Sequence, residues 1–205
     1  MVHYNAATKT VQTYDGRETA PAAATENYLR HVSATDTSTP KPDLGSQFAN
    51  VRASGRAIGT PGAVRMLELA HQDNGKLPWA DLFQPGIKLA TDGFPIGGRM
   101  ASAIAGARND LLRDAEATAY FLNPDLTPRA LGTTIKNPAY AATLTSIAQG
   151  GANALYTGPI AQSIVDKIKV TSGGATTTVA ITPGLTEMSD LANYKAVRRP
   201  AVCFR

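Results

Sequence analysis

Apolar and polar residues alternate at the start of the chain. Val2 and Tyr4 flank a polar residue, and Val11 and Thr13 do the same, which predicts two strands. The polar stretch 5–9 between them predicts the turn of a hairpin. Because two short strands are marginally stable alone, we expect the hairpin to join a larger sheet, whose other strands we expect to lie outside this chain.

Beyond residue 60 the apolar residues recur at helical spacing. Thr60 is predicted to cap a first helix, which begins with Pro61 and ends at Gly75. Asn137 and Pro138 predict another helix start in the same way. Helical segments are predicted over 60–75, 77–93 (two short helices or one kinked at Pro85), 101–112, 137–150, 159–168 and 186–194.

The rest of the pattern is less regular. Segment 170–183 fits a strand or an ordered loop equally well, and 201–205 is strand-like, so we expect both ends of the chain to interrupt strands. The predicted fold class is α+β, mostly helical with an N-terminal hairpin. Three sections are expected: 1–25 with the hairpin and a polar loop, 26–54 as a connector, and 55–205 as a mainly helical part.

Composition narrows the functional classes. The chain has 205 residues, 43% hydrophobic and 18% charged, which is typical of a globular protein and excludes fibrous and low-complexity classes. The formal net charge of +4 is small and the basic residues are scattered without an aromatic ladder, so a nucleic-acid partner is not expected. No apolar run approaches the length of a membrane span, and the first residues lack the apolar core of a signal peptide.

The sequence contains few residues in the patterns that bind metals or cofactors. A single cysteine, Cys203, excludes an internal disulfide and a cysteine-rich zinc site, and the three histidines form no zinc-binding pair. A phosphate-binding loop and a nucleophile elbow are also absent from the sequence. The glycine-spaced segment 55–62 could offer amides to an anion, but Pro61 removes one donor, which favours an ordinary turn. No metal or cofactor is therefore expected.

Arg17 is the most distinctive polar residue. It directly follows a predicted strand, and a guanidinium so placed can bind a carboxylate through two parallel hydrogen bonds. Asp15 and Glu18 lie beside it, so a local salt bridge is the simpler alternative. Spacing alone leaves both interpretations open.

Ordered sequence blocks then indicate a family. Segment 15–25, DGRETAPAAAT, resembles a large-subunit motif of the gamma-glutamyltranspeptidases. The pattern continues in the same order through nearly the whole chain, with GRAIGTPG at 55–62, ELAH at 68–71, GKLPWADLFQPGIKLA at 75–90, GFP at 93–95, IAQGGANALYTG at 147–158 and LTEMSDLANY at 185–194.

The resemblance implies an enzyme that transfers the gamma-glutamyl group of glutathione and related compounds to water, amino acids or peptides. It implies an acyl-threonine intermediate, on a threonine that becomes the N-terminus of a small subunit after self-cleavage. By the same resemblance, Arg17 corresponds to the family's arginine that binds the α-carboxylate of the gamma-glutamyl substrate. The implied fold is an αββα sandwich of the N-terminal nucleophile hydrolases, and the implied location is periplasmic or extracellular.

The nucleophile is not expected in this chain. The threonine pairs at 133–134 and 176–177 have the wrong context and place in the family order, so no catalytic residue is assigned. We expect the chain to be an internal section of the large subunit, inactive without the small subunit and the remaining large subunit. A glutaryl or cephalosporin-type acylase of the same fold, and a non-catalytic domain that binds glutamate-like ligands, stay as alternatives.

Overall fold

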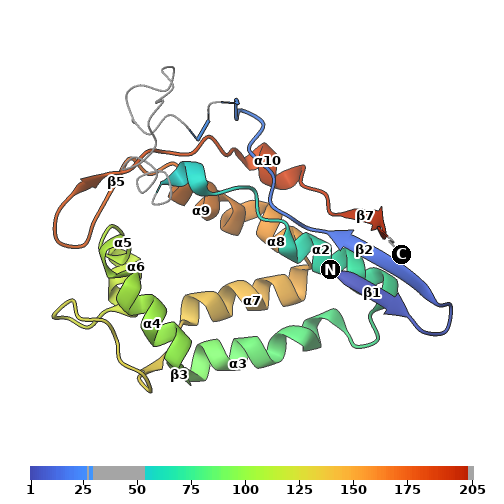
Figure 1. Cartoon of the computed structure of the whole chain (residues 1–205), viewed down its shortest axis with the longest axis horizontal. Helices are drawn as coiled ribbons and strands as arrows, with labels where there is room; N and C mark the ends of the chain where they lie inside the picture. Colours follow the sequence, from blue (N-terminus) through green and yellow to red (C-terminus); the bar gives the residue numbers. More distant parts are fainter. Residues whose placement is uncertain (27, 30–53, 203–205) are drawn as a thin grey trace.

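The computed structural model describes residues 1–26, 28–29 and 54–202. Most of the predicted connector 26–54 therefore lies outside the described residues. Small β-sheets and a larger set of helices make up the chain (Figure 1). The predicted α+β class is confirmed.

The predicted N-terminal hairpin is present. Strand β1 (Val2–Asn5) pairs antiparallel with β2 (Thr10–Asp15), with Tyr4 opposite Val11. A third strand, β7 (Val197–Pro200), pairs antiparallel with the other edge of β2, giving the order β1-β2-β7. The expectation that the neighbouring strands lie outside this chain is thus wrong for one edge of β2. The strand predicted over 201–205 is wrong for residues 201–202, because the pairing ends at residue 200, and residues 203–205 lie outside the described part.

The first long helix is α2 (Ala63–Asn74), and Gly75 follows it as predicted. Its N-terminus differs from the prediction, since Gly62 and not Thr60 occupies the N-cap. Thr60 is fully buried and its backbone exchanges hydrogen bonds with Thr19, at 2.8 Å and 3.3 Å. This long-range bridge holds Thr60 in an extended conformation, so it cannot cap the helix.

The segment around Pro85 forms two helical pieces, which was one of the two predicted alternatives. A 3-10 helix, η2 (Trp79–Phe83), runs directly into α3 (Gln84–Asp92), where Pro85 occupies the first turn. Proline is tolerated there because the first amides of a helix have no partner within it. Trp79 donates its indole N–H to the carbonyl of Ile147 at 3.0 Å, which fixes this unit against helix α7 (Pro138–Gly150).

The predicted helix over 101–112 is divided in two, and two short helices were not predicted. Asn137 caps α7 as predicted, since its side chain accepts a hydrogen bond from the amide of Tyr140. The unpredicted helices are α6 and α8. The helices are α4 (Gly98–Gly106), α5 (Arg108–Leu111), α6 (Ala115–Phe121), α7 (Pro138–Gly150), α8 (Asn153–Tyr156), α9 (Gly158–Ile168) and α10 (Met188–Ala192), preceded by the 3-10 helix η1 (Gly55–Ala57).

Two small antiparallel pairs complete the described structure. β3 (Phe94–Pro95) pairs with β4 (Thr134–Ile135), and β5 (Ser172–Gly173) pairs with β6 (Val179–Ala180). Segment 170–183, which the sequence left undecided, is therefore a short hairpin with loops.

Two buried clusters hold the helices together. One joins α8, α9 and α10, and its buried members are Ala152, Tyr156, Ala161, Val165, Leu191 and Tyr194. The other lies around β3, β4, α4 and the end of α6, and its buried members are Ile96, Ile104, Leu122 and Ile135. The first cluster lies beside the sheet, because Tyr194 leads directly toward β7.

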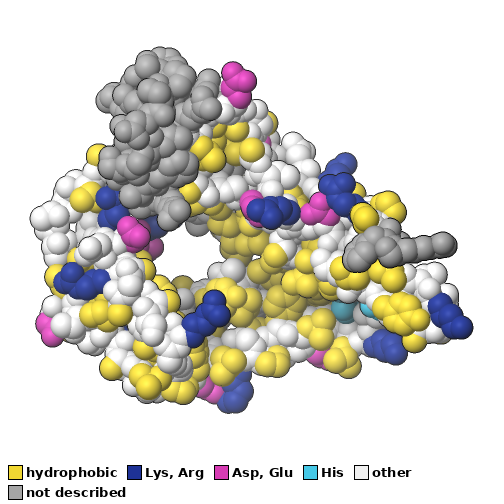
Figure 2. Space-filling view, in the orientation of Figure 1, with side chains coloured by type: hydrophobic (Ala, Val, Ile, Leu, Met, Phe, Trp, Pro, Cys, Tyr) yellow, Lys and Arg dark blue, Asp and Glu magenta, His cyan; other side chains and the backbone are white. Residues whose placement is uncertain are grey.

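Several large apolar side chains remain exposed, among them Val2 at 69% and Tyr4 at 58% on β1. Figure 2 shows hydrophobic side chains across one face of the molecule, with a hollow near its centre. A pocket of about 680 Å³ lies among α6, α7, α8 and α9. Exposed apolar area of this kind is typical of surfaces that contact other protein.

Candidate functional site

Arg17 lies two residues beyond the end of β2, and its side chain is 83% exposed. Its Nε lies 3.3 Å from the Glu18 carboxylate, so the local salt bridge that the sequence allowed is formed. An ion pair this exposed stabilises little and leaves most of the guanidinium open to solvent. The structure therefore places Arg17 where an incoming anion can reach it.

The backbone of Arg17 is held on both sides. Its amide donates to the Asp15 carboxylate at 3.0 Å, and its carbonyl accepts a hydrogen bond from the Tyr194 hydroxyl at 2.7 Å. Asp15 also accepts a hydrogen bond from Nε of Arg199 on β7 at 2.7 Å. The Arg17 amide and then the Arg199 guanidinium lower the pKa of Asp15, so this carboxylate stays ionised at neutral pH.

Two glycines allow the turn to approach α2 closely. A Cβ on Gly16 would lie 2.2 Å from Cβ of Met66, and a Cβ on Gly62 would lie 2.0 Å from the Tyr194 hydroxyl. Any larger residue at either position would force the turn or the tyrosine to move. The turn is therefore packed between the start of α2 and the Tyr194 side chain.

Tyr194 belongs to the first buried cluster. Its ring stacks on Tyr156, with centroids 5.8 Å apart and an interplanar angle of 14°. Burial raises the pKa of Tyr194, and the nearby charges of Asp15 and Glu18 raise it further. The hydroxyl thus stays protonated and donates to Arg17.

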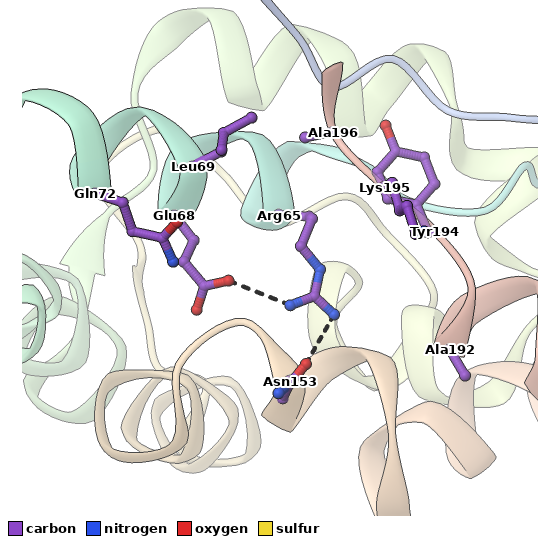
Figure 3. Close-up of a pocket in the computed structure, with 9 residues that line it drawn as sticks. All are labelled: Arg65, Glu68, Leu69, Gln72, Asn153, Ala192, Tyr194, Lys195 and Ala196. Carbon is purple, nitrogen blue, oxygen red and sulfur yellow. Dashed lines mark hydrogen bonds and ion pairs between the residues drawn. The ribbon is translucent and has the colours of Figure 1, made fainter. Parts of the chain in front are cut away.

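A pocket of about 390 Å³ lies next to Tyr194 and Lys195 (Figure 3). Arg65 on its wall donates to the Glu68 carboxylate at 3.2 Å and to the Asn153 side chain at 2.9 Å. The Arg65 guanidinium also lies 4.5 Å from the centroid of the Tyr156 ring. These groups bind one another across α2 and α8, so their role is to join the two helices.

Segment 55–62 forms the 3-10 helix η1 and then the bridge at Thr60, in place of the ordinary turn that the sequence favoured. The amides of Gly55, Ile58 and Thr60 donate to backbone carbonyls, as does that of Ala57. Arg56 is buried and donates to the carbonyl of Tyr28 at 2.9 Å. These amides are thus occupied within the protein.

The structure adds two observations on metals and membranes. Within residues 1–26, 28–29 and 54–202, histidine, cysteine and carboxylate side chains form no group of three that could hold a metal ion. Over the same residues, no helix combines the length and hydropathy that crossing a bilayer requires.

The hydrogen bond from Tyr194 to Arg17 was not predicted from the sequence. The two residues are 177 positions apart, and no spacing rule connects them. The one available signal was that both fall in blocks of the same family pattern, at 15–25 and 185–194.

Comparisons with known proteins agree with the pattern of blocks. The family described as Gamma-glutamyltranspeptidase matches residues 1–205. A glutathione hydrolase proenzyme of Arthroderma benhamiae is 33% identical over 193 residues, which cover 93% of this chain and 29% of that protein. This chain therefore spans less than a third of that relative's length.

Solved structures of similar fold include a member of the same family. The gamma-glutamyltranspeptidase of Helicobacter pylori matches with a TM-score of 0.77 and 26% identity, over 98% of this chain and 52% of that chain. A cephalosporin acylase of Bacillus halodurans shares the fold, with a TM-score of 0.66 and 21% identity, over 92% of this chain and 32% of that chain. The chain belongs to the gamma-glutamyltranspeptidase family.

Proposed function

We propose that this chain is a section of the large subunit of a gamma-glutamyltranspeptidase, and that Arg17 binds the α-carboxylate of its gamma-glutamyl substrate. One observation carries the proposal. The Arg17 guanidinium is 83% exposed, while the amide and the carbonyl of the same residue are both hydrogen-bonded to the protein. A held backbone that presents a largely exposed guanidinium suits two-point recognition of a carboxylate.

The reaction is an acyl transfer. A threonine at the N-terminus of a small subunit attacks the gamma-carbonyl of glutathione or a related compound, and its own free amine takes the hydroxyl proton as general base. The amide C–N bond then breaks, and the amine part of the donor leaves with that proton. The acyl-threonine intermediate then passes the gamma-glutamyl group to water, an amino acid or a peptide. Arg17 contributes by fixing the α-carboxylate, which orients the gamma-carbonyl toward the threonine.

The partners follow from this role. The small subunit and the remaining large subunit complete the site, and autocatalytic cleavage of a precursor produces the two subunits. The proenzyme name of the Arthroderma relative supports this processing. A periplasmic or extracellular location is part of the same proposal and comes from the family alone.

The test uses the full-length protein that contains this chain, with a gamma-glutamyl anilide as donor. Arg17→Ala should raise KM for the donor by about tenfold to a hundredfold, because a charge-assisted carboxylate contact is lost. Arg17→Lys should recover part of the affinity, since a point charge replaces a two-point contact. Arg99→Ala, at an exposed arginine on α4, is the matched control and should leave KM unchanged.

An unchanged KM in Arg17→Ala would contradict the proposal. The same assay with a glutaryl anilide separates the acylase alternative, because that substrate keeps a terminal carboxylate and lacks the amine. Faster turnover of the glutaryl substrate would favour the acylase. Calorimetry of glutamate with the isolated chain tests the non-catalytic alternative, and we expect no binding.

The isolated 205-residue chain should not hydrolyse a gamma-glutamyl anilide, because we assign its nucleophile to the small subunit. Turnover by purified chain of verified mass would overturn that assignment.

A further inference from the structure

We propose that Tyr194 is a positioning residue for the Arg17 guanidinium, acting through the hydrogen bond from its hydroxyl to the Arg17 carbonyl. The inference rests on the proposed role of Arg17 in binding the α-carboxylate. On this inference, Tyr194 contributes to binding of the gamma-glutamyl donor without contacting it.

The hydrogen bond has the length that is usual for a hydroxyl donor and a carbonyl acceptor. The Tyr194 hydroxyl lies 2.7 Å from the Arg17 carbonyl oxygen, and the Arg17 amide is bound 3.0 Å from Asp15 on the opposite side of the residue. With both peptide groups held, the Arg17 Cα is fixed and only the side chain retains freedom. Loss of either bond would let the whole residue move.

Tyr194 is itself rigid. The residue is 7% exposed, and its ring stacks on Tyr156, which is fully buried. The hydroxyl fits against Gly62, where a Cβ would lie at 2.0 Å. Because the Tyr194 hydroxyl is held in place, it fixes the Arg17 carbonyl far better than a water molecule would. The buried cluster of α8, α9 and α10 therefore determines where Arg17 lies.

Preorganisation is the physical reason to expect an effect on binding. When the Arg17 turn is already ordered before the substrate binds, the binding free energy does not include the entropy cost of ordering that turn. Without the hydroxyl, the carbonyl would bind water and the guanidinium would sample more positions. Donor affinity should therefore fall, while the chemistry at the gamma-carbonyl should change little.

The test is Tyr194→Phe in the full-length protein, assayed with a gamma-glutamyl anilide. This change keeps the stacked ring and removes the hydroxyl. KM for the donor should rise about three- to tenfold, with kcat within about twofold of wild type. In an Arg17→Ala background the same substitution should cause no further rise, because the guanidinium that it positions is gone.

A donor without the α-carboxylate gives a second readout. With a 4-aminobutyryl anilide, Tyr194→Phe and wild type should have the same KM. The matched control is Tyr156→Phe, which also removes a buried tyrosine hydroxyl. That hydroxyl accepts a hydrogen bond from the Arg65 amide at 3.2 Å and does not contact Arg17. It should lower the melting temperature at least as much as Tyr194→Phe does, with no rise in KM.

An unchanged donor KM in Tyr194→Phe, alongside a raised KM in Arg17→Ala, would overturn the positioning role and keep the proposed function. An equal rise in KM for Tyr156→Phe, or an additive rise in the Arg17→Ala background, would reduce Tyr194 to a structural role and overturn the inference. An unchanged KM in Arg17→Ala would remove the proposed function and this inference with it.

Discussion

The Arg198 guanidinium on β7 donates two hydrogen bonds to the Asp73 carboxylate on α2, from Nε at 2.7 Å and from Nη2 at 2.6 Å. The same carboxylate accepts a hydrogen bond from the Tyr14 hydroxyl on β2 at 2.9 Å. One side chain thus joins α2 to two neighbouring strands. It fixes the sheet against the helix whose first turn packs on the Arg17 turn.

This network should make stability depend on pH. The hydrogen bonds of Arg198 and then Tyr14 lower the pKa of Asp73 to about 2 in the folded protein. A carboxyl whose pKa falls on folding stabilises the folded state above its unfolded pKa, near 4, and loses that contribution as the pH falls toward 2. Asp73→Asn should therefore lower the melting temperature at pH 7, and the difference from wild type should shrink by pH 2.5.

Thermal unfolding followed by circular dichroism at several pH values measures this difference in the full-length protein. Asp81→Asn, at an exposed carboxylate on η2, is the control and should match wild type at neutral pH. A destabilisation by Asp73→Asn that is equally large at pH 2.5 would contradict the assignment.

Gly62→Ala should disturb the Arg17 turn without touching Arg17. The new Cβ would lie 2.0 Å from the Tyr194 hydroxyl and 2.4 Å from the Gly16 carbonyl oxygen, so one of them must move. We expect a lower melting temperature and a raised donor KM. Gly98→Ala is the comparison, because its Cβ meets no described atom within 4 Å, and it should leave both values unchanged. Wild-type KM in Gly62→Ala would argue against close packing at this turn.

Leu191→Ala should be strongly destabilising. Leu191 is fully buried in the cluster with Tyr156 and Tyr194, and truncation of such a side chain typically costs about 2–5 kcal/mol of unfolding free energy. Leu131 is 67% exposed, and Leu131→Ala should change stability by less than about 0.5 kcal/mol. Urea unfolding compares the two, and equal effects would show that the burial assignment is incorrect.

Asn137→Ala should remove the cap of α7. The Asn137 side chain accepts a hydrogen bond from the Tyr140 amide at 2.9 Å. Loss of such a cap typically lowers the free energy of unfolding by about 1 kcal/mol. Asn137→Asp keeps the acceptor and should stay within a few tenths of wild type in the same urea experiment. If both variants lose the same stability, the cap is not the cause.

Locally encoded elements were predictable from the sequence. Asn137 with Pro138, and Gly75 at a helix end, specify their elements through contacts only a few residues away, and both were placed correctly. Helix α6 was missed although Asp114 caps it, because its seven residues show too little periodicity. Short helices of this kind depend on the packing around them.

Elements that depend on distant contacts were placed wrongly or missed. Thr60 was expected to cap α2, but its backbone pairs with Thr19, which no local pattern reveals. Strand β7 is exposed and has two arginines among its four residues, so the strand-like segment 201–205 was chosen instead. Its pairing is supported by ion pairs such as Arg199 with Asp15, 184 positions apart. The motif made Arg17 a candidate site residue, whereas no local pattern indicated its hydrogen bond with Tyr194.

The pairing of β2 with β7 also sets an order for folding. The Thr13 hydroxyl donates to the Arg199 carbonyl across 186 positions, so the ribosome must add that many residues after Thr13 before this contact can form. Closing so long a loop costs conformational entropy that is recovered only when the paired strands and Tyr194 are in place. The turn that carries Arg17 can therefore reach its final conformation only after residues 194–200 have been synthesised.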